Sequence, residues 1–151
     1  VDSSALPEQV TRDVIASAFQ SAGQRCSALR VLYLQEDVAD TMLTMIRGAF
    51  EALVIGDPAE LATDVGPVID AAAKARLDAH IAAMRAAGCK VWQRDLPPAC
   101  AGGTFVAPAI IAIGGIGDLD EEHFGPILHV ARFPAGGIAA VVDAINASGY
   151  G

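Results

Sequence analysis

The sequence contains 151 residues, of which 53% are hydrophobic, and it carries a formal net charge of −8. This length and composition predict one folded domain over residues 1–151 and exclude a disordered chain. The ten Lys and Arg residues are scattered, so they form no concentrated basic stretch that would bind nucleic acid. No apolar run is long enough to cross a bilayer, and the three cysteines lack zinc-ligand spacing. We therefore expect a protein of a reducing, cytoplasmic setting without a metal site.

Helix-like and strand-like segments alternate along the chain. Apolar residues at helical spacing predict four helices, over residues 7–21, 38–53, 71–87 and 138–145. Asp37 and Asp70 are expected to cap the second and third of these helices. Apolar runs predict four strands, over residues 29–34, 89–94, 104–113 and 127–133. Pro108 predicts that the third strand is broken or lies at an edge of the sheet. The alternation is typical of parallel βαβ units and predicts an α/β fold, layered helix–sheet–helix with a mostly parallel sheet.

One cysteine lies at the junction between the first predicted helix and the first predicted strand, in the segment "SAGQRCSALR" of residues 21–30. Cysteine at such a place often serves as a small buried hydrophobic residue. The alternative is a nucleophile, which needs a partly exposed thiolate near main-chain N–H groups that hold a negative oxygen. Gly23 allows the sharp turn that would present Cys26 in this way. The junction alone leaves both interpretations open.

A second stretch favours the nucleophile. Residues 120–130, "DEEHFGPILHV", contain the pattern E-x-F-G-P directly before a predicted strand and follow "GQRC" in the chain. In this order and spacing, the two motifs resemble the aldehyde dehydrogenase superfamily, and "IGDP" at residues 55–58 resembles a turn of that family. A narrower resemblance is to the glutamate γ-semialdehyde (1-pyrroline-5-carboxylate) dehydrogenase domain of the bifunctional proline utilisation A enzymes. It rests on "SAFQSAGQRCSALRVLYLQEDVAD", "DVGPVID", "FGPILHVARF" and "INASGYG".

The resemblance implies roles for four residues. Cys26 would be the nucleophile that attacks the aldehyde carbon, and its main-chain N–H would be one donor to the oxyanion. Ser27 would bind the α-carboxylate of glutamate γ-semialdehyde. Glu122 would bind the ribose hydroxyls at the nicotinamide end of NAD, and Phe124 would pack against the nicotinamide. The implied reaction is the NAD-dependent oxidation of this aldehyde to glutamate through a thiohemiacetal and a thioester on the cysteine.

Each of the other three residues also has an ordinary structural interpretation. Ser27 could shape a turn, and Phe124 could be a core aromatic residue. Glu122 belongs to the acidic run "DLDEE", and such runs are usually solvated. Cys89 and Cys100 match no family site and are expected to be passive. His80, His123 and His129 show no arrangement of partners in the sequence, and a surface or packing role is expected for them.

The resemblance covers only part of an aldehyde dehydrogenase. The sequence has no Gly-rich phosphate-binding turn, and the E-x-G-G general base and the oxyanion asparagine of the family would precede residue 1. The substrate-anchoring loop and the oligomerisation strands would follow residue 151. We therefore interpret the chain as a truncated, cysteine-bearing part of the catalytic domain, which alone is expected to be inactive and to bind NAD weakly or not at all. Its uncovered apolar surface predicts contact with the remainder of the parent enzyme, or self-association.

Two alternatives remain open. The chain could come from another aldehyde dehydrogenase, of the succinic or betaine aldehyde type, which the substrate profile of the parent would distinguish. It could also be a non-catalytic interaction or regulatory module derived from the same fold. Preferential alkylation of Cys26 would favour the enzyme over the module.

Overall fold

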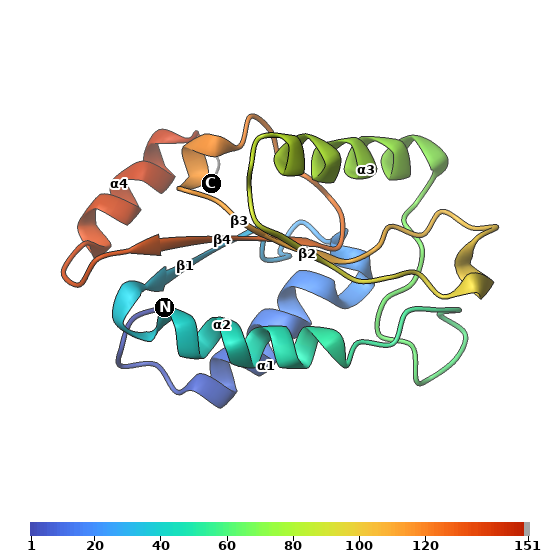
Figure 1. Cartoon of the computed structure of the whole chain (residues 1–151), viewed down its shortest axis with the longest axis horizontal. Coiled ribbons are helices and arrows are strands. Elements are labelled where there is room, and N and C mark those ends of the chain that lie inside the picture. Colours follow the sequence, from blue (N-terminus) through green and yellow to red (C-terminus); the bar gives the residue numbers. More distant parts are fainter. Residues whose placement is uncertain (150–151) are drawn as a thin grey trace.

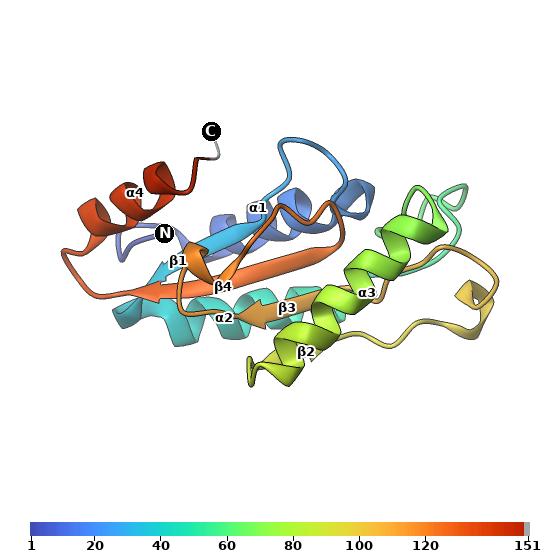
Figure 2. The ribbon, with the colours of Figure 1, turned by 90° about the horizontal axis from the view of Figure 1, so that it is seen from above.

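The computed structural model describes residues 1–149 and has three layers, with a four-stranded sheet between helices (Figure 1). One face of the sheet is covered by α1 (Pro7–Phe19) and α2 (Glu36–Glu51). The opposite side carries α3 (Ala71–Ala86) and α4 (Ile138–Ala147). Seen from above in Figure 2, α3 lies over the β2–β3 side of the sheet and α4 lies toward the β1–β4 side. The predicted α/β class and its layering are confirmed.

The strands stand in the order β1-β4-β3-β2. Their bounds are Val31–Gln35 for β1, Val91–Gln93 for β2, Ala109–Ala112 for β3 and Ile127–Phe133 for β4. β4 pairs in parallel with both β1 and β3, whereas β2 pairs with β3 in antiparallel orientation. His129 of β4 is opposite Val31 of β1 and Ile111 of β3, so it occupies the middle of the sheet. The sheet is therefore mostly parallel, as predicted.

Pro108 predicted either a broken strand or an edge strand, and the structure excludes the edge strand. β3 lies inside the sheet and begins at Ala109, directly after the proline. The Pro108 carbonyl accepts a hydrogen bond from the Arg94 main-chain N–H at 3.0 Å. A proline just before a strand removes no donor from the ladder, so an interior strand can follow it. The expected break is present, because only 109–112 of the predicted 104–113 form a strand.

The two predicted helix caps have different outcomes. Asp70 caps α3, since its Oδ1 accepts a hydrogen bond from the Ala73 main-chain N–H at 2.6 Å. Gly88, with φ of +88°, follows the end of this helix in the left-handed conformation. Asp37 is not the cap of α2, because β1 leads directly into the helix and Gln35 takes the capping position. The Asp37 carboxylate accepts a hydrogen bond from Gln35 Nε2 at 2.8 Å and lies in the first helical turn.

Apolar side chains fill both spaces between the sheet and the helices. On one side, the rings of Phe19 and Phe50 pack against each other with their centroids 5.2 Å apart. On the other side, α3 buries the four residues predicted from its spacing, which are Ala73, Leu77, Ile81 and Met84. Within the described chain, no helix combines the length and the apolar composition needed to cross a membrane.

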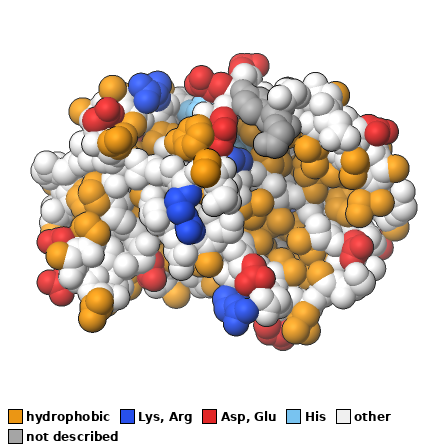
Figure 3. Space-filling view, turned by 180° about the vertical axis from the view of Figure 1, so that it is seen from behind, with side chains coloured by type: hydrophobic (Ala, Val, Ile, Leu, Met, Phe, Trp, Pro, Cys, Tyr) orange, Lys and Arg blue, Asp and Glu red, His pale blue; other side chains and the backbone are white. Residues whose placement is uncertain are grey.

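α4 is packed differently from the other helices. Within the described chain, none of its residues is buried, and its apolar side chains Ile138, Val142 and Ile145 are exposed. Figure 3 shows hydrophobic side chains gathered on the side of the molecule that carries this helix. The helix predicted for this segment is confirmed, but its apolar face is left uncovered.

Candidate active site

Residues 20–28, the first part of the segment that joins α1 to β1, are called the thiol loop below. α1 ends at Phe19, two residues earlier than predicted, and the turn Gln20–Gly23 follows as a short 3-10 helix. Ser21 and Ala22 have φ values of 55° and 51°, and the glycine after them has 63°. The left-handed region is strained for residues that carry a Cβ, so the surrounding contacts must impose this conformation. Strain of this kind is concentrated at functional segments.

A tight turn presents the cysteine to solvent. The Ala28 main-chain N–H donates to the Arg25 carbonyl at 3.1 Å, which places Cys26 and Ser27 at the two central positions. Both residues are exposed, so the interpretation of Cys26 as a buried hydrophobic residue is wrong. Among the described residues, nothing accepts a hydrogen bond from the Cys26 main-chain N–H, which leaves this donor available to a ligand.

The acid–aromatic segment, residues 120–126, lies beside the thiol loop and precedes β4. Cys26 and Glu122 line the same cavity, of about 380 Å³. Phe124 is 45% exposed and lines a neighbouring hollow of about 310 Å³, to which Glu122 also contributes. The structure thus brings Cys26, Glu122 and Phe124 together from two distant parts of the chain. Ser27 lines neither of these two cavities, although it adjoins the cysteine.

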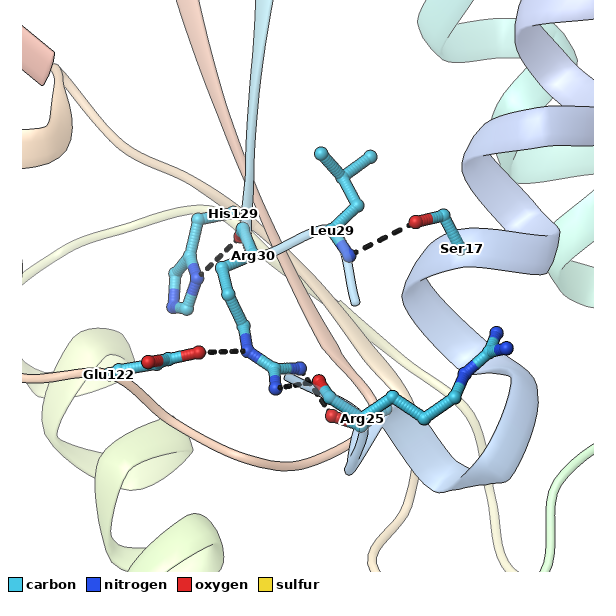
Figure 4. Close-up of polar contacts among 7 residues, drawn as sticks. Ser17, Arg25, Leu29, Arg30, Glu122 and His129 are labelled. Atoms are coloured by element: carbon cyan, nitrogen blue, oxygen red, sulfur yellow. Dashed lines mark hydrogen bonds and ion pairs between the residues drawn. The ribbon is translucent and has the colours of Figure 1, made fainter. Parts of the chain in front are cut away.

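Two side chains near the cysteine make contacts that the sequence analysis did not anticipate. Gln24 accepts a hydrogen bond from the Ile69 N–H at 2.8 Å and approaches the Pro67 carbonyl at 3.5 Å, which ties the "DVGPVID" segment to the thiol loop. Arg30 Nε lies 3.2 Å from Glu122 Oε1. Figure 4 marks this contact with a dashed line. A signal for Arg30 was present in the sequence, because a charged residue directly before a buried strand requires a partner.

The three histidines form a cluster beside the cavity, which contradicts the expectation that they lack partners. The rings of His80 and His123 are stacked with centroids 3.5 Å apart. His80 Nε2 lies 2.8 Å from His129 Nε2, and His129 Nδ1 lies 3.1 Å from the Arg30 carbonyl oxygen. A carbonyl only accepts, so His129 carries its proton on Nδ1 and accepts a hydrogen bond from His80 at Nε2. This arrangement requires the His129 ring to be neutral, whereas His80 can donate from Nε2 in either of its protonation states.

Burial favours the neutral form of all three histidines. Loss of hydration, with a smaller contribution from the neighbouring His123, lowers the pKa of His80 to about 4. Loss of hydration also lowers the pKa of His129 to about 4, against the opposing hydrogen bond to the Arg30 carbonyl. The pKa of His123 is lowered by burial and by Arg30, although Glu121 opposes the shift. The cluster adds no positive charge to the cavity at neutral pH.

Known proteins match this chain along its full length. The profile described as "Aldehyde dehydrogenase family" matches residues 1–151. The chain belongs to the aldehyde dehydrogenase family. The bifunctional protein PutA of Klebsiella aerogenes is 54% identical over 156 aligned residues, which cover 100% of this chain and 12% of that protein. The glutarate-semialdehyde dehydrogenase of Pseudomonas aeruginosa is 36% identical over 121 residues, covering 79% of this chain and 25% of that enzyme.

A solved structure agrees with this membership. The crystal structure described as bifunctional proline utilization A (PutA) has a TM-score of 0.90 and 54% identity, over 97% of this chain and 15% of that one. Both the family resemblance and the narrower resemblance to the PutA aldehyde dehydrogenase region are therefore confirmed. The chain spans 12% of the length of the PutA relative.

Family members generally use NAD(P), and two features of this site fit the nicotinamide end of such a cofactor. Glu122 receives a hydrogen bond from Arg30 at Oε1, and no other described residue donates to this carboxylate. Its second oxygen can therefore accept hydrogen bonds from sugar hydroxyls. The exposed ring of Phe124 offers an apolar face to a planar ring. The residues present thus fit one end of the cofactor.

Proposed function

We propose that this chain supplies the nucleophile and the nicotinamide-end contacts of an NAD-dependent aldehyde dehydrogenase that oxidises glutamate γ-semialdehyde to glutamate in proline catabolism. The observation that carries this proposal is the cavity shared by the exposed Cys26 and by Glu122. The 54% identity to a PutA over the whole chain, against 36% to a glutarate-semialdehyde dehydrogenase over 79% of it, supports the substrate.

The chemistry begins at the sulfur of Cys26. Its thiolate attacks the aldehyde carbon, a C–S bond forms, and the carbonyl electron pair moves to the oxygen. The main-chain N–H of Cys26 donates to the resulting oxyanion. When bound, NAD⁺ supplies the acceptor for the hydride that leaves this carbon. The acyl group then remains on Cys26 as a thioester, and water cleaves the C–S bond to release the carboxylate and regenerate the thiol.

The other residues bind and orient. Glu122 accepts hydrogen bonds from the hydroxyls of the nicotinamide ribose, and Phe124 packs against the nicotinamide end. Ser27, exposed next to the nucleophile, donates to the α-carboxylate of the substrate. This last contact gives the site its preference for an acidic aldehyde.

The experiment uses the full-length protein that carries this chain, because the general base of the family is proposed to lie outside residues 1–151. NADH formation from glutamate γ-semialdehyde is measured for the wild type, for Cys26→Ala and for Cys89→Ala as the matched control. We expect Cys26→Ala to lower the rate by at least about a thousandfold and Cys89→Ala to leave it unchanged. An active Cys26→Ala protein would falsify the mechanism. An inactive wild type would favour a non-catalytic module.

The substrate class is tested separately by Ser27→Ala. Loss of a hydrogen bond to a charged group costs about 1.5–3 kcal/mol, so we expect kcat/KM for the acidic aldehyde to fall by about tenfold or more. A simple alkyl aldehyde should be oxidised as before. Equal losses on both substrates would mean that Ser27 shapes the turn, and preference for a betaine or succinic aldehyde would identify the alternative type of dehydrogenase.

The 151-residue chain alone is proposed to turn over no aldehyde and to bind NAD weakly or not at all. Its exposed α4 side chains Ile138, Val142 and Ile145 support the prediction that the isolated chain self-associates. Light scattering over a concentration series measures this association, and a constant monomer mass would contradict it.

A further inference from the structure

Arg30 lies between the thiol loop and the acid–aromatic segment, and neither the two motifs nor the proposed mechanism assigns it a role. We propose that Arg30 is a positioning residue that keeps the thiol loop and the acid–aromatic segment in one arrangement and thereby supports cofactor binding. This proposal rests on the proposed function. It is the residue before β1, and its side chain is only 13% exposed although it is charged. A buried guanidinium must satisfy its donors.

On one side, the guanidinium binds the main chain of the thiol loop. Nη2 donates to the Arg25 carbonyl at 2.9 Å, and Nη1 donates to the Gly23 carbonyl. The Gly23 carbonyl ends the left-handed stretch, and the Arg25 carbonyl begins the turn that carries Cys26. Figure 4 shows the guanidinium lying between this main chain and Glu122. Because the guanidinium is planar and its donors are fixed, binding both carbonyls sets the orientation of the loop.

On the other side, the same guanidinium contacts both residues proposed for the nicotinamide end. Nε donates to Glu122 Oε1 at 3.2 Å. The guanidinium carbon lies 4.6 Å from the centroid of the Phe124 ring, within the range of a cation–π interaction. Phe124 is 45% exposed, so this contact restricts a ring that is only partly held by burial. The Arg30 side chain therefore sets the positions of Glu122, Phe124 and the thiol loop relative to one another.

The main chain of Arg30 is itself fixed against the sheet. The Arg30 carbonyl accepts from the His129 main-chain N–H at 2.9 Å and from His129 Nδ1 at 3.1 Å. The preceding residue, Leu29, donates its N–H to Ser17 Oγ of α1 at 3.1 Å. The guanidinium thus extends from a rigid support, which is the property that a positioning residue needs.

The chain offers a closely matched control. Arg94 also donates to two main-chain carbonyls, those of Phe50 at 2.7 Å and Leu53 at 3.1 Å, and pairs with Glu51 at 3.3 Å. Its side chain is 21% exposed, and it lines neither of the two cavities of the site. Arg94→Lys therefore removes a similar set of guanidinium hydrogen bonds without affecting the thiol loop.

The first test measures NAD⁺ binding by calorimetry with the full-length protein, as wild type, Arg30→Lys and Arg94→Lys. Lysine keeps the charge but cannot hold two carbonyls, a carboxylate and a ring at once. We expect Arg30→Lys to raise the Kd for NAD⁺, and the KM for NAD⁺ in the assay, by about tenfold with a smaller change in kcat. Arg94→Lys should change neither. Equal NAD⁺ affinity in the two variants would overturn the assignment.

The second test uses hydrogen exchange in the absence of NAD⁺, so it does not depend on the proposed activity. In Arg30→Lys, peptides covering 20–28 and 120–126 should exchange faster together while the rest of the protein is unchanged. Unchanged exchange in these peptides, or faster exchange everywhere, would overturn the assignment. A wild type that binds no NAD⁺ would reject the proposed function, and the exchange result would still decide the role of Arg30. If Arg30→Lys and Arg30→Gln both fail to fold, Arg30 serves the fold and the assignment is rejected.

Discussion

The main chain of Gly23 packs directly against the main chain of Gly125, since a Cβ placed on Gly23 would lie 2.1 Å from the Gly125 carbonyl oxygen. A Cβ placed on Gly125 would in turn lie 2.5 Å from a methyl carbon of Leu77 in α3. The acid–aromatic segment is therefore held between the thiol loop and α3. The missing side chain of Gly23 lets the two segments of the site approach this closely, and that of Gly125 lets the acid–aromatic segment approach α3.

Gly23→Ala is expected to destabilise the protein by about 2–4 kcal/mol, because the new methyl group meets main-chain atoms and φ is +63°. Urea unfolding of the chain measures the loss. Gly48→Ala is the control, since this glycine is exposed in α2 and a Cβ there has no neighbour within 4 Å. It should stabilise by about 0.5–1 kcal/mol. Equal effects of the two substitutions would contradict the close contact.

The three cysteines are expected to react with iodoacetamide in the order of their exposure. Cys26 is exposed, Cys89 is partly buried and Cys100 is 3% exposed, so Cys26 should be alkylated first and Cys100 last. Mass spectrometry of peptides from the folded chain, sampled over time, gives the three rates. In urea the three rates should converge. Faster labelling of Cys100 than of Cys26 in the folded chain would show that the thiol loop is built differently.

Stability is expected to fall as the pH falls from about 6.5 toward 4. The pKa values of His80 and His129 are about 4 in the folded protein, below the ordinary value of 6.5, so the unfolded chain binds more protons within this window. The contribution of the histidines is complete above pH 6.5 and is lost as the pH falls through their folded pKa values. Urea unfolding at several pH values measures the slope.

His80→Gln provides the control for this pH dependence. The glutamine amide can donate to His129 as His80 does, but it does not titrate. The slope of stability against pH between 6.5 and 5 should therefore become shallower. An unchanged slope would assign the pH dependence to other groups, and histidine NMR resonances that titrate near pH 6.5 in the folded chain would refute the depressed pKa values.

Asp70→Ala and Asp37→Ala are expected to differ in cost. Asp70 caps α3 through its hydrogen bond to the Ala73 N–H, so its removal should destabilise the chain by about 1 kcal/mol. Asp37 only accepts from the Gln35 side chain in the first turn of α2, and its removal should cost a few tenths of a kcal/mol, within about 0.5. Thermal or urea unfolding of both variants compares them. A larger loss of stability for Asp37→Ala than for Asp70→Ala would show that Asp37 does cap α2.

Local features of the sequence predicted the elements well, because they depend on neighbours along the chain. The spacing of the apolar residues in α3 identified all four of its buried side chains, and the run 127–133 coincides with β4. The error at Asp37 and the choice left open at Pro108 have a common cause. Whether an aspartate caps a helix, or a proline adjoins an interior strand, depends on where the preceding strand ends and which strands stand beside it.

The residues of the site were identified in part from the sequence, through two motifs that resemble a family. The same sequence did not reveal why Arg30 and the histidines matter. Arg30 meets a carboxylate 92 positions away, and His80 meets His129 across 49 positions. Nothing in either local segment specifies these partners.

By itself the sequence determined the α/β class, the family and the position of a cysteine between a helix and a strand. Only the tertiary structure decided that this cysteine is exposed, that Glu122 shares its cavity, and that Arg30 links the two segments. The physical reason is the strand order. β4 pairs in parallel with β1, which brings the segment before β4 next to the loop before β1 and so creates the contacts of the site.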